Sequence, residues 1–238
     1  MEYSKKGKIV YIGGLMKSRK SGVLNDIYRR SLLHPNIRVI GLQPLINLGR
    51  DGPWIISRDK FTDKIAKIPA FTFRNSDDLY DLTTDTVKEE EQYRGPYKKV
   101  ILLVDEAHFG DSKSIERFQM LREEGKDIFV AGLFRNWMKE KIHFKGDSEP
   151  RIKTIDDLVG ISDHVINNTA IACCEYVKGK GFVEAKEGDE KCWEIANEVQ
   201  LTFKGQPARY GDHPEFILEG FENYGYFDAC KEHHILLR

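Results

Sequence analysis

The chain has 238 residues, of which 40% are apolar and 32% charged, a balance typical of soluble globular domains. Its 37 basic and 38 acidic residues give a formal charge of −1, so the composition points to neither nucleic acid nor a membrane surface as a partner. No apolar run reaches the roughly 18 residues of a membrane-spanning helix, and the opening MEYSKKGK lacks the apolar stretch of a signal peptide. We therefore expect a cytoplasmic protein that binds no nucleic acid and no membrane.

The first two thirds of the sequence alternate apolar runs with amphipathic segments, which predicts a parallel α/β sheet. The stretch 45–60 is rich in glycine and proline and is predicted to be a loop. The last third carries short β-like pieces and all four cysteines, with one further helix expected at 189–197. We place a domain boundary near Asn167, which gives a core of 1–167 and a small domain of 168–238. Predicted strands cover 9–12, 37–42, 70–73, 98–105, 127–133 and 163–167, and predicted helices cover 22–33, 77–91, 111–125 and 155–161.

The segment that starts at Lys8 has the layout of a phosphate-binding loop, in which an apolar strand and a polar turn lead into a helix. The usual pattern is G-x-x-x-x-G-K-[ST]. Gly14 takes the first glycine place, Lys20 and Ser21 supply the K-S pair, and Arg19 stands where the second glycine belongs. The lysine would neutralise the β- and γ-phosphates of a nucleotide, and the serine hydroxyl would bind Mg²⁺. A lysine–serine pair on an ordinary surface is the alternative, but the flanking strand and helix favour the phosphate loop.

An acidic pair, Asp105 and Glu106, stands at the end of the continuous apolar run Val100–Val104, which is typical of a strand buried on both faces. Open α/β sheets bind their ligands at the carboxyl ends of the strands, so Asp105 there would help to hold the Mg²⁺ of a bound nucleotide. Glu106 would act as a general base or position a water. Capping of the following helix is the alternative role. Together with the phosphate loop, the pair predicts a P-loop nucleotide enzyme.

Four blocks together resemble the thymidine kinases of the tetrameric, zinc-containing type. GLMKSRKS at Gly14–Ser21 resembles that family's G-P-M-F-S-G-K-[ST], and DEAHF at Asp105–Phe109 resembles its D-E-[AG]-Q-F. GLFRNW at Gly132–Trp137 resembles G-L-D-x-D-F, and YFDACKEH at Tyr226–His233 resembles the closing tyrosine followed by C-x-x-[CH]. The blocks stand in the family's order and extend over nearly the whole chain.

The resemblance implies a P-loop NTPase-like parallel sheet flanked by helices, with a small C-terminal lasso domain like a zinc ribbon. It also implies transfer of the γ-phosphate of ATP to the 5′-hydroxyl of thymidine or a related pyrimidine deoxynucleoside, with Glu106 accepting the hydroxyl proton. A homo-oligomer, tetramer or dimer, is the implied assembly. The implied ATP contacts are Gly14, Lys17, Ser18, Arg19, Lys20 and Ser21, the Mg²⁺ contacts are Ser21 and Asp105, and the nucleoside contacts are Met16, Phe109, Leu133, Trp137 and Tyr226. Core packing is the alternative role for the nucleoside contacts.

Several residues depart from the family pattern. Arg19 replaces a glycine whose backbone often has a positive φ, a conformation that costs another residue roughly 1–2 kcal/mol. Its side chain would either crowd the phosphates or add a charge to them. Phe134 and Asn136 remove two acids from G-L-D-x-D-F, and His108 replaces a glutamine. These changes bear on the substrate more than on the fold.

The zinc site implied by the resemblance is irregular. The family's ribbon pairs C-x-x-C with C-x-x-[CH], which gives zinc four tetrahedral ligands. Cys230 and His233 match the second half, but the first half reads Cys173-Cys174, adjacent residues whose side chains diverge. The candidate set is therefore Cys173, Cys174, Cys230 and His233. In one alternative only one of the adjacent pair binds and Cys192 or His234 completes the set. In the other, zinc has been lost.

Three functions compete. Retention of Lys20, Ser21, Asp105 and Glu106 favours a deoxynucleoside kinase that uses ATP, Mg²⁺ and optionally Zn²⁺. Arg19 and the irregular cysteine spacing favour a catalytically impaired relative that binds nucleotide for regulation or assembly. A DNA-dependent ATPase is the third candidate, and the near-neutral charge argues against it.

Overall fold

The computed structural model describes residues 6–14, 18–58, 65–136, 138–147, 153–168, 173–192, 194–196, 198–209, 212–213 and 223–235. The chain falls into two compact units. The larger unit comprises Met1–Gly13, Arg19–Gly132 and His143–Ile166, and the smaller comprises Gly14–Ser18, Leu133–Ile142 and Asn167–Arg238. Within the described part of the chain, no helix has the length and apolar character needed to span a membrane.

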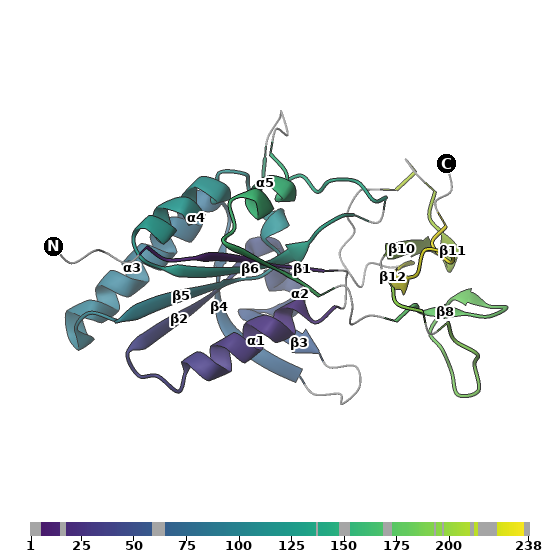
Figure 1. Ribbon diagram of the computed structural model, residues 1–238, viewed down its shortest axis with the longest axis horizontal. Helices are drawn as coiled ribbons and strands as arrows, with labels where there is room; N and C mark the ends of the chain where they lie inside the picture. The colour runs from purple at the N-terminus through teal and green to yellow at the C-terminus, as the bar shows by residue number, and fades with distance from the viewer. Residues whose placement is uncertain are drawn as a thin grey trace. The chain divides into compact units, whose positions relative to one another are not determined.

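A mostly parallel seven-stranded sheet is the centre of the fold, in the order β3-β4-β2-β5-β6-β1-β7 (Figure 1). β2 pairs in parallel with β4 and β5, and β5 pairs in parallel with β6, whereas β3 runs antiparallel to β4. Because β2, β5 and β6 are parallel, their carboxyl ends meet at one edge, and Asp105 follows β5 directly at that edge. The strands are β1 Ile9–Gly14, β2 Ile37–Pro44, β3 Trp54–Arg58, β4 Ile65–Phe73, β5 Lys99–Val104, β6 Asp127–Leu133 and β7 His164–Asn167.

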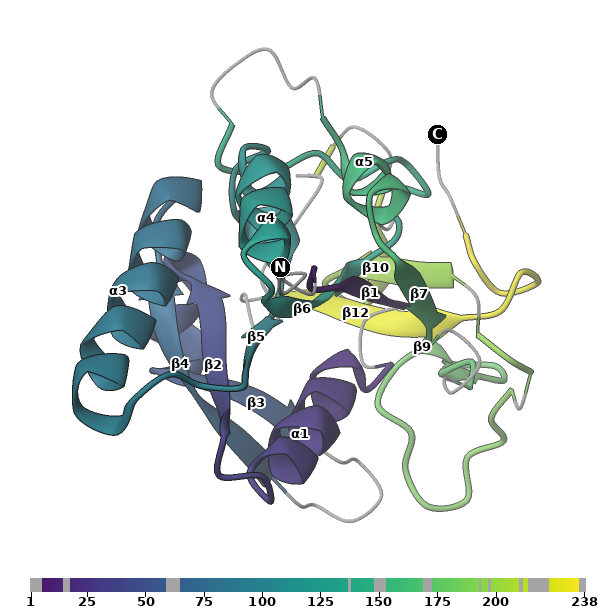
Figure 2. The same cartoon turned by 60° about the vertical axis from the view of Figure 1, so that its left-hand side comes forward.

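Helices cover both faces of this sheet, with α1 on one face and α3 and α4 on the other (Figures 1 and 2). β5 shows why both faces need cover: Ile101 and Leu103 pack in a cluster with Leu24 of α1, and the alternate residue Leu102 is also fully buried. The helices are α1 Lys20–Ser31, α2 Leu48–Asp51, α3 Ser76–Arg94, α4 Ser114–Glu123 and α5 Ile155–Gly160, with 3-10 helices η1 Leu45–Asn47 and η2 Ala107–Phe109.

The helix ends follow local sequence chemistry. α3 begins after Asn75, whose side chain accepts the Asp78 N–H at 2.9 Å, and it ends at Gly95, which has a positive φ of 79°. α5 begins at a capping box formed by Thr154 and Asp157. Side-chain acceptors at the N-termini thus fix where these helices start.

The smaller unit is built from short antiparallel strands around its own core. Figure 2 shows β12 alongside β10, and β11 pairs with the other edge of β10. Its core contains Val199, Leu201, Ala208 and Tyr226. The strands are β8 Tyr176–Val177, β9 Gly181–Phe182, β10 Glu198–Phe203, β11 Gln206–Pro207 and β12 Tyr224–Ala229.

The predicted fold class is confirmed: the sheet is mostly parallel, helices flank it, and a cysteine–histidine cluster lies near the C-terminus. Two element predictions are wrong. The stretch 45–60 is not a loop throughout, because Trp54–Arg58 forms an edge strand against Ile65–Phe73. The helix at 189–197 is absent from the described residues of that stretch, because its backbone is hydrogen-bonded to other segments. Cys192 N–H donates to Tyr176 O at 2.9 Å, and Lys191 bridges to Val177.

Candidate active site

A hydrogen bond joins the phosphate loop helix to the acidic end of β5. Ser21, in the first turn of α1, donates from Oγ to Oδ2 of Asp105 at 3.0 Å. Asp105 is 5% exposed, and its N–H donates to Leu42 O of the neighbouring β2 at 3.0 Å. Hydroxyl and carboxylate oxygens are ligands that Mg²⁺ prefers. The arrangement fits a magnesium ion held by Ser21 and Asp105, directly or through water.

The first turn of α1 is electrostatically suited to an anion. The helix begins at Lys20 rather than at the predicted Gly22, so both Lys20 and Ser21 belong to its first turn. That turn contains no acidic residue, whereas Arg29 and Arg30 occupy the last turn. Because a helix N-terminus carries partial positive charge, Lys20 adds a full charge where a phosphate would be stabilised.

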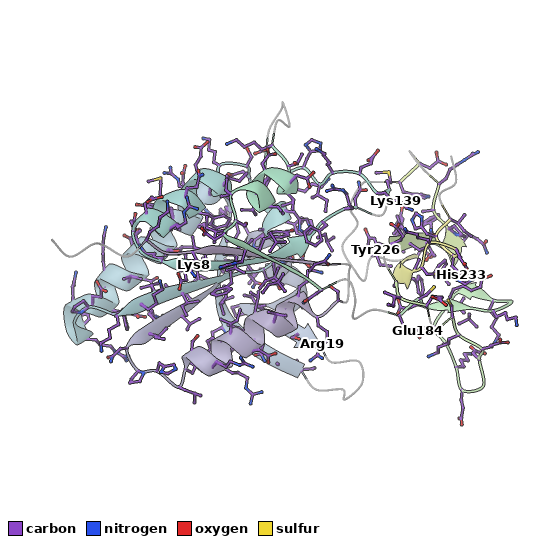
Figure 3. The ribbon with its side chains drawn as sticks, viewed as in Figure 1. Lys8, Arg19, Lys139, Glu184, Tyr226 and His233 are labelled. Carbon is purple, nitrogen blue, oxygen red and sulfur yellow. The ribbon has the colours of Figure 1, made fainter. Side chains whose placement is uncertain are left out.

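Arg19 has the backbone conformation that the loop pattern predicts for a glycine. Its φ of 61° and ψ of 26° are left-handed, and it is the residue that precedes the helix. Its carbonyl accepts the N–H of Val23 at 3.1 Å. Figure 3 shows Arg19 at the N-terminal end of α1. A Cβ placed on Gly22 would lie 3.5 Å from Arg19 Cβ and 3.8 Å from its Nε, so the side chain lies along the first turn of the helix.

Glu106 is the second strained residue of the site, with φ 51° and ψ 43°. Its Oε2 atom is buried and has no hydrogen-bond partner among the described residues. Nδ1 of His108 lies 3.4 Å from this oxygen. The His108 side chain is 1% exposed and that of Glu106 is 21% exposed. A carboxylate that is part-exposed and not committed to a cation has the properties of a general base.

Other candidate residues lie elsewhere in the chain. In the smaller unit, a Cβ added to Gly14 would fall 2.2 Å from Ser18 Oγ, so a side chain there would require the serine hydroxyl to move. Leu133 ends β6, and Tyr226 of β12 packs in the core of the smaller unit (Figure 3). Phe109 belongs to η2 in the larger unit. Met16, Lys17 and Trp137 lie outside the described residues.

A cysteine–histidine cluster forms the second candidate site, in the smaller unit. The ligand atoms of Cys174, Cys192, Cys230 and His233 all lie within 4.8 Å of one another. The distance from His233 Nδ1 is 3.2 Å to Cys230 Sγ and 3.7 Å to Cys174 Sγ, and the Cys192 and Cys230 sulfurs are 4.0 Å apart. Tetrahedral zinc separates such ligands by about 3.5–3.8 Å. The four side chains therefore fit a zinc ion.

Cys192, and not the predicted Cys173, belongs to this cluster. Cys173 is exposed and Cys174 buried, as expected for adjacent residues of an extended segment, whose side chains point to opposite sides. The alternative set completed by Cys192 is the one that the structure assembles. Burial raises the pKa of the Cys174 thiol to about 12, so it keeps its proton unless a metal displaces it.

The approach of His108 to Glu106 is not predicted from the sequence, where His108 is noted only as a replacement for glutamine. The 3-10 turn brings it back towards Glu106, two positions earlier. The signal that could have predicted this contact is a histidine two positions after a candidate base, in a segment that forms a tight turn.

Comparison with known proteins gives partial similarity. No family model matches the chain. The thymidine kinase of Mycoplasmoides gallisepticum is 30% identical over 138 residues, which is 58% of this chain and 48% of that protein. The genome packaging NTPase B204 of Sulfolobus turreted icosahedral virus 2, solved in complex with ATP-γS, aligns with a TM-score of 0.34 and 18% identity over 53% of this chain and 64% of that one. The chain spans about half the length of the curated relative, and over that part it is similar to a thymidine kinase.

Proposed function

We propose that the protein is a deoxynucleoside kinase, which transfers the γ-phosphate of ATP to the 5′-hydroxyl of thymidine or a related pyrimidine deoxynucleoside. The observation that carries the proposal is the Ser21–Asp105 hydrogen bond, with Glu106 next in the chain at the carboxyl edge of the sheet. The partial similarity to a thymidine kinase supports it.

In this proposal each polar residue has a separate task. The first turn of α1, with Arg19 and Lys20, binds the β- and γ-phosphates, while Ser21 and Asp105 hold Mg²⁺. The bound ion supplies neutralisation of the phosphate charge. Glu106 accepts the proton of the 5′-hydroxyl while the hydroxyl oxygen forms a bond to the γ-phosphorus. The bond from that phosphorus to the bridging oxygen of ADP breaks in the same step.

The remaining contacts are also part of the proposal. The predicted nucleoside contacts are Met16, Phe109, Leu133, Trp137 and Tyr226. The predicted assembly is a homo-oligomer. Zinc would be held by Cys174, Cys192, Cys230 and His233, and would cross-link segments of the smaller unit that are distant in sequence.

One observation favours a second candidate function. Arg19 brings both backbone strain and a bulky cation to a position that is glycine in the loop pattern. A chain impaired in this way could bind nucleotide without turning it over, and serve regulation or assembly.

A coupled ADP-release assay over a panel of deoxynucleosides tests the kinase proposal. We expect turnover of at least one pyrimidine deoxynucleoside, and Glu106→Gln should lower kcat by about 10²–10⁴-fold because the proton acceptor is lost. Glu89→Gln, at an exposed position of α3, is the matched control and should retain full activity.

Two outcomes would contradict the proposal in different ways. A wild-type protein that binds ATP but phosphorylates no nucleoside would favour the regulatory alternative. A fully active Glu106→Gln variant would show that Glu106 is not the base, while leaving the kinase assignment intact.

A further inference from the structure

We propose that His108 is a positioning residue, which donates its Nδ1–H to Glu106 Oε2 and holds the carboxylate with Oε1 directed to the attacking hydroxyl. The inference rests on the proposed function, in which Glu106 accepts the proton of the nucleoside hydroxyl. It adds a residue that fixes how the base is oriented.

The geometry pairs a buried acceptor with a buried donor. Glu106 Oε2 is buried, and His108 Nδ1 is 3.4 Å away on a side chain that is 1% exposed. An ionised carboxylate only accepts hydrogen bonds, whereas a neutral imidazole donates from one of its two nitrogens. A separation slightly longer than a formed hydrogen bond is common in sites without substrate, and it shortens when the reactive complex forms. The Nδ1–H tautomer satisfies the carboxylate oxygen that no other described residue reaches.

The surrounding backbone holds His108 in place. Lys145 N–H donates to His108 O at 2.9 Å, and Gly146 N–H donates to Gly110 O at 2.9 Å. The imidazole ring also lies 4.3 Å from the ring of Phe109, centroid to centroid. The segment at 145–146 therefore fixes the turn that carries His108, and a donor on a fixed turn is suited to orienting a neighbouring side chain.

The Glu106 carboxylate needs a second contact to fix its orientation. The left-handed backbone of this residue, with φ 51°, sets where the side chain leaves the chain, but its carboxylate can still rotate about the side-chain torsions. Binding one oxygen to His108 removes that rotation and leaves the other for the substrate.

Kinetics on two substitutions separate donor chemistry from packing. His108→Leu fills a similar volume without a donor, and His108→Gln keeps one. We expect His108→Leu to lower kcat about 10- to 100-fold, because the base is misoriented, with the KM for ATP unchanged and His108→Gln close to wild type. In a Glu106→Gln background, His108→Leu should have no further effect, because the two residues act as one unit.

Two kinetic results would overturn the inference. One is a His108→Leu variant that unfolds at the wild-type temperature and retains the wild-type kcat. The other is a loss of kcat that is the same in the wild-type and Glu106→Gln backgrounds, because the effect of His108 would then not pass through Glu106.

Nitrogen NMR tests the contact without requiring any activity. The chain has 7 histidines, and the His108 signals are those that disappear in ¹⁵N-histidine-labelled His108→Gln. We expect Nδ1 of His108 to carry the proton and its shift to change in Glu106→Ala, which removes the acceptor. A proton on Nε2 with Nδ1 bare would overturn the inference. An inactive wild type that still shows the Nδ1–H contact would contradict the kinase proposal alone, so the two failures are distinguishable.

Discussion

Backbone strain in the larger unit is found at the residues that the site depends on. Arg19 and Glu106 both have a left-handed backbone. Arg19 stands two residues before Ser21 and Glu106 directly follows Asp105, and Ser21 and Asp105 share a hydrogen bond. Such conformations cost about 1 kcal/mol or more each, and persist where the surrounding structure enforces them. At the residue scale, this coincidence of strain and chemistry is what distinguishes the site from an ordinary strand end.

Arg19→Gly should raise the free energy of unfolding by up to about 1 kcal/mol, because glycine adopts a positive φ without steric strain. Urea unfolding measures this, with Arg19→Ala as the control that removes the guanidinium but keeps a Cβ. Equal stability of the two variants would contradict the strain argument. Titration calorimetry with ATP reports on the charge separately: both variants bind ATP more weakly if Arg19 contacts phosphate, and more tightly if it crowds the phosphates.

At the scale of elements, the packing of β1 against β6 requires a glycine. A Cβ at Gly132 would lie 2.7 Å from the hydroxyl oxygen of Tyr11, whose side chain is fully buried. We expect Gly132→Ala to lower the free energy of unfolding by about 1–3 kcal/mol through overpacking. In Tyr11→Phe the obstructing oxygen is absent, so the double variant should be more stable than the sum of the single changes predicts.

The control for this cycle is Gly160→Ala at the end of α5, where an added Cβ would meet nothing within 4 Å. It should leave the midpoint of denaturant unfolding unchanged or slightly higher. Strict additivity of Gly132→Ala and Tyr11→Phe would show that the hydroxyl is not what excludes a side chain at 132.

A hydrogen-bonded carboxylate ties α3 to β2 and makes stability depend on pH. Glu90 accepts hydrogen bonds from Arg38 Nη2 and from the Tyr97 hydroxyl, each at 2.7 Å. Burial alone would raise the pKa of Glu90, but these hydrogen bonds, first from Tyr97 and then from Arg38, outweigh it and lower the pKa below its usual 4.5. The stabilisation is therefore present above the pKa of the unfolded chain and is lost as the pH falls through the folded-state value.

Glu90→Gln should lower the free energy of unfolding by about 1 kcal/mol near neutral pH, a modest value because the carboxylate is part-exposed. The difference from wild type should shrink at about pH 3, where the wild-type carboxyl is also neutral. Chemical denaturation at both pH values measures it. A deficit that is the same at both, or one shared by the exposed Glu89→Gln, would contradict the assignment to Glu90.

The elements that could be predicted are those whose signal is local. β5 could be predicted because it is a continuous apolar run buried on both faces. α3 could be predicted only in part, over 77–91, as a polar and acidic stretch with a solvated face. β3 was missed because Gly52 and Pro53 dominate its neighbourhood, while its actual stabilisation comes from pairing with β4. The helix expected at 189–197 failed because tertiary pairing with 174–177 overrides local preference.

On the scale of the whole molecule, the metal proposal makes a selective prediction. Cys192→Ser should abolish stoichiometric zinc in the purified protein and destabilise the smaller unit, because one of four ligands is lost. Cys173→Ser is the matched control and should retain one zinc per chain, since Cys173 is exposed and outside the cluster. Atomic absorption with a thermal melt measures both. Zinc retained by Cys192→Ser but lost by Cys173→Ser would contradict the assignment.

The candidate sites could be predicted from the sequence where they depend on strand topology, but not where they depend on how distant segments pair. Ser21 and Asp105 could be placed together because the rule that ligands bind at the carboxyl ends of parallel strands holds without knowing any contact. Cys192 could only be one of several options, since which thiol meets Cys230 depends on how the 174–177 and 189–196 segments pair. The approach of His108 to Glu106 likewise depends on a left-handed residue that the sequence does not specify.

The closing of the sheet at β7 has a consequence for how the chain is made. Asp163 holds the start of β1 from both sides: Ile9 N–H donates to its carboxylate at 2.7 Å, and its own N–H donates to Ile9 O at 2.8 Å. β1 is therefore synthesised long before β7, the strand that covers its edge. At about 5–20 residues per second, that edge stays open for several seconds or more. A nascent or truncated chain that stops short of Asp163 would expose β1 as a template for other strands, so its yield should depend on chaperones more than that of the full chain.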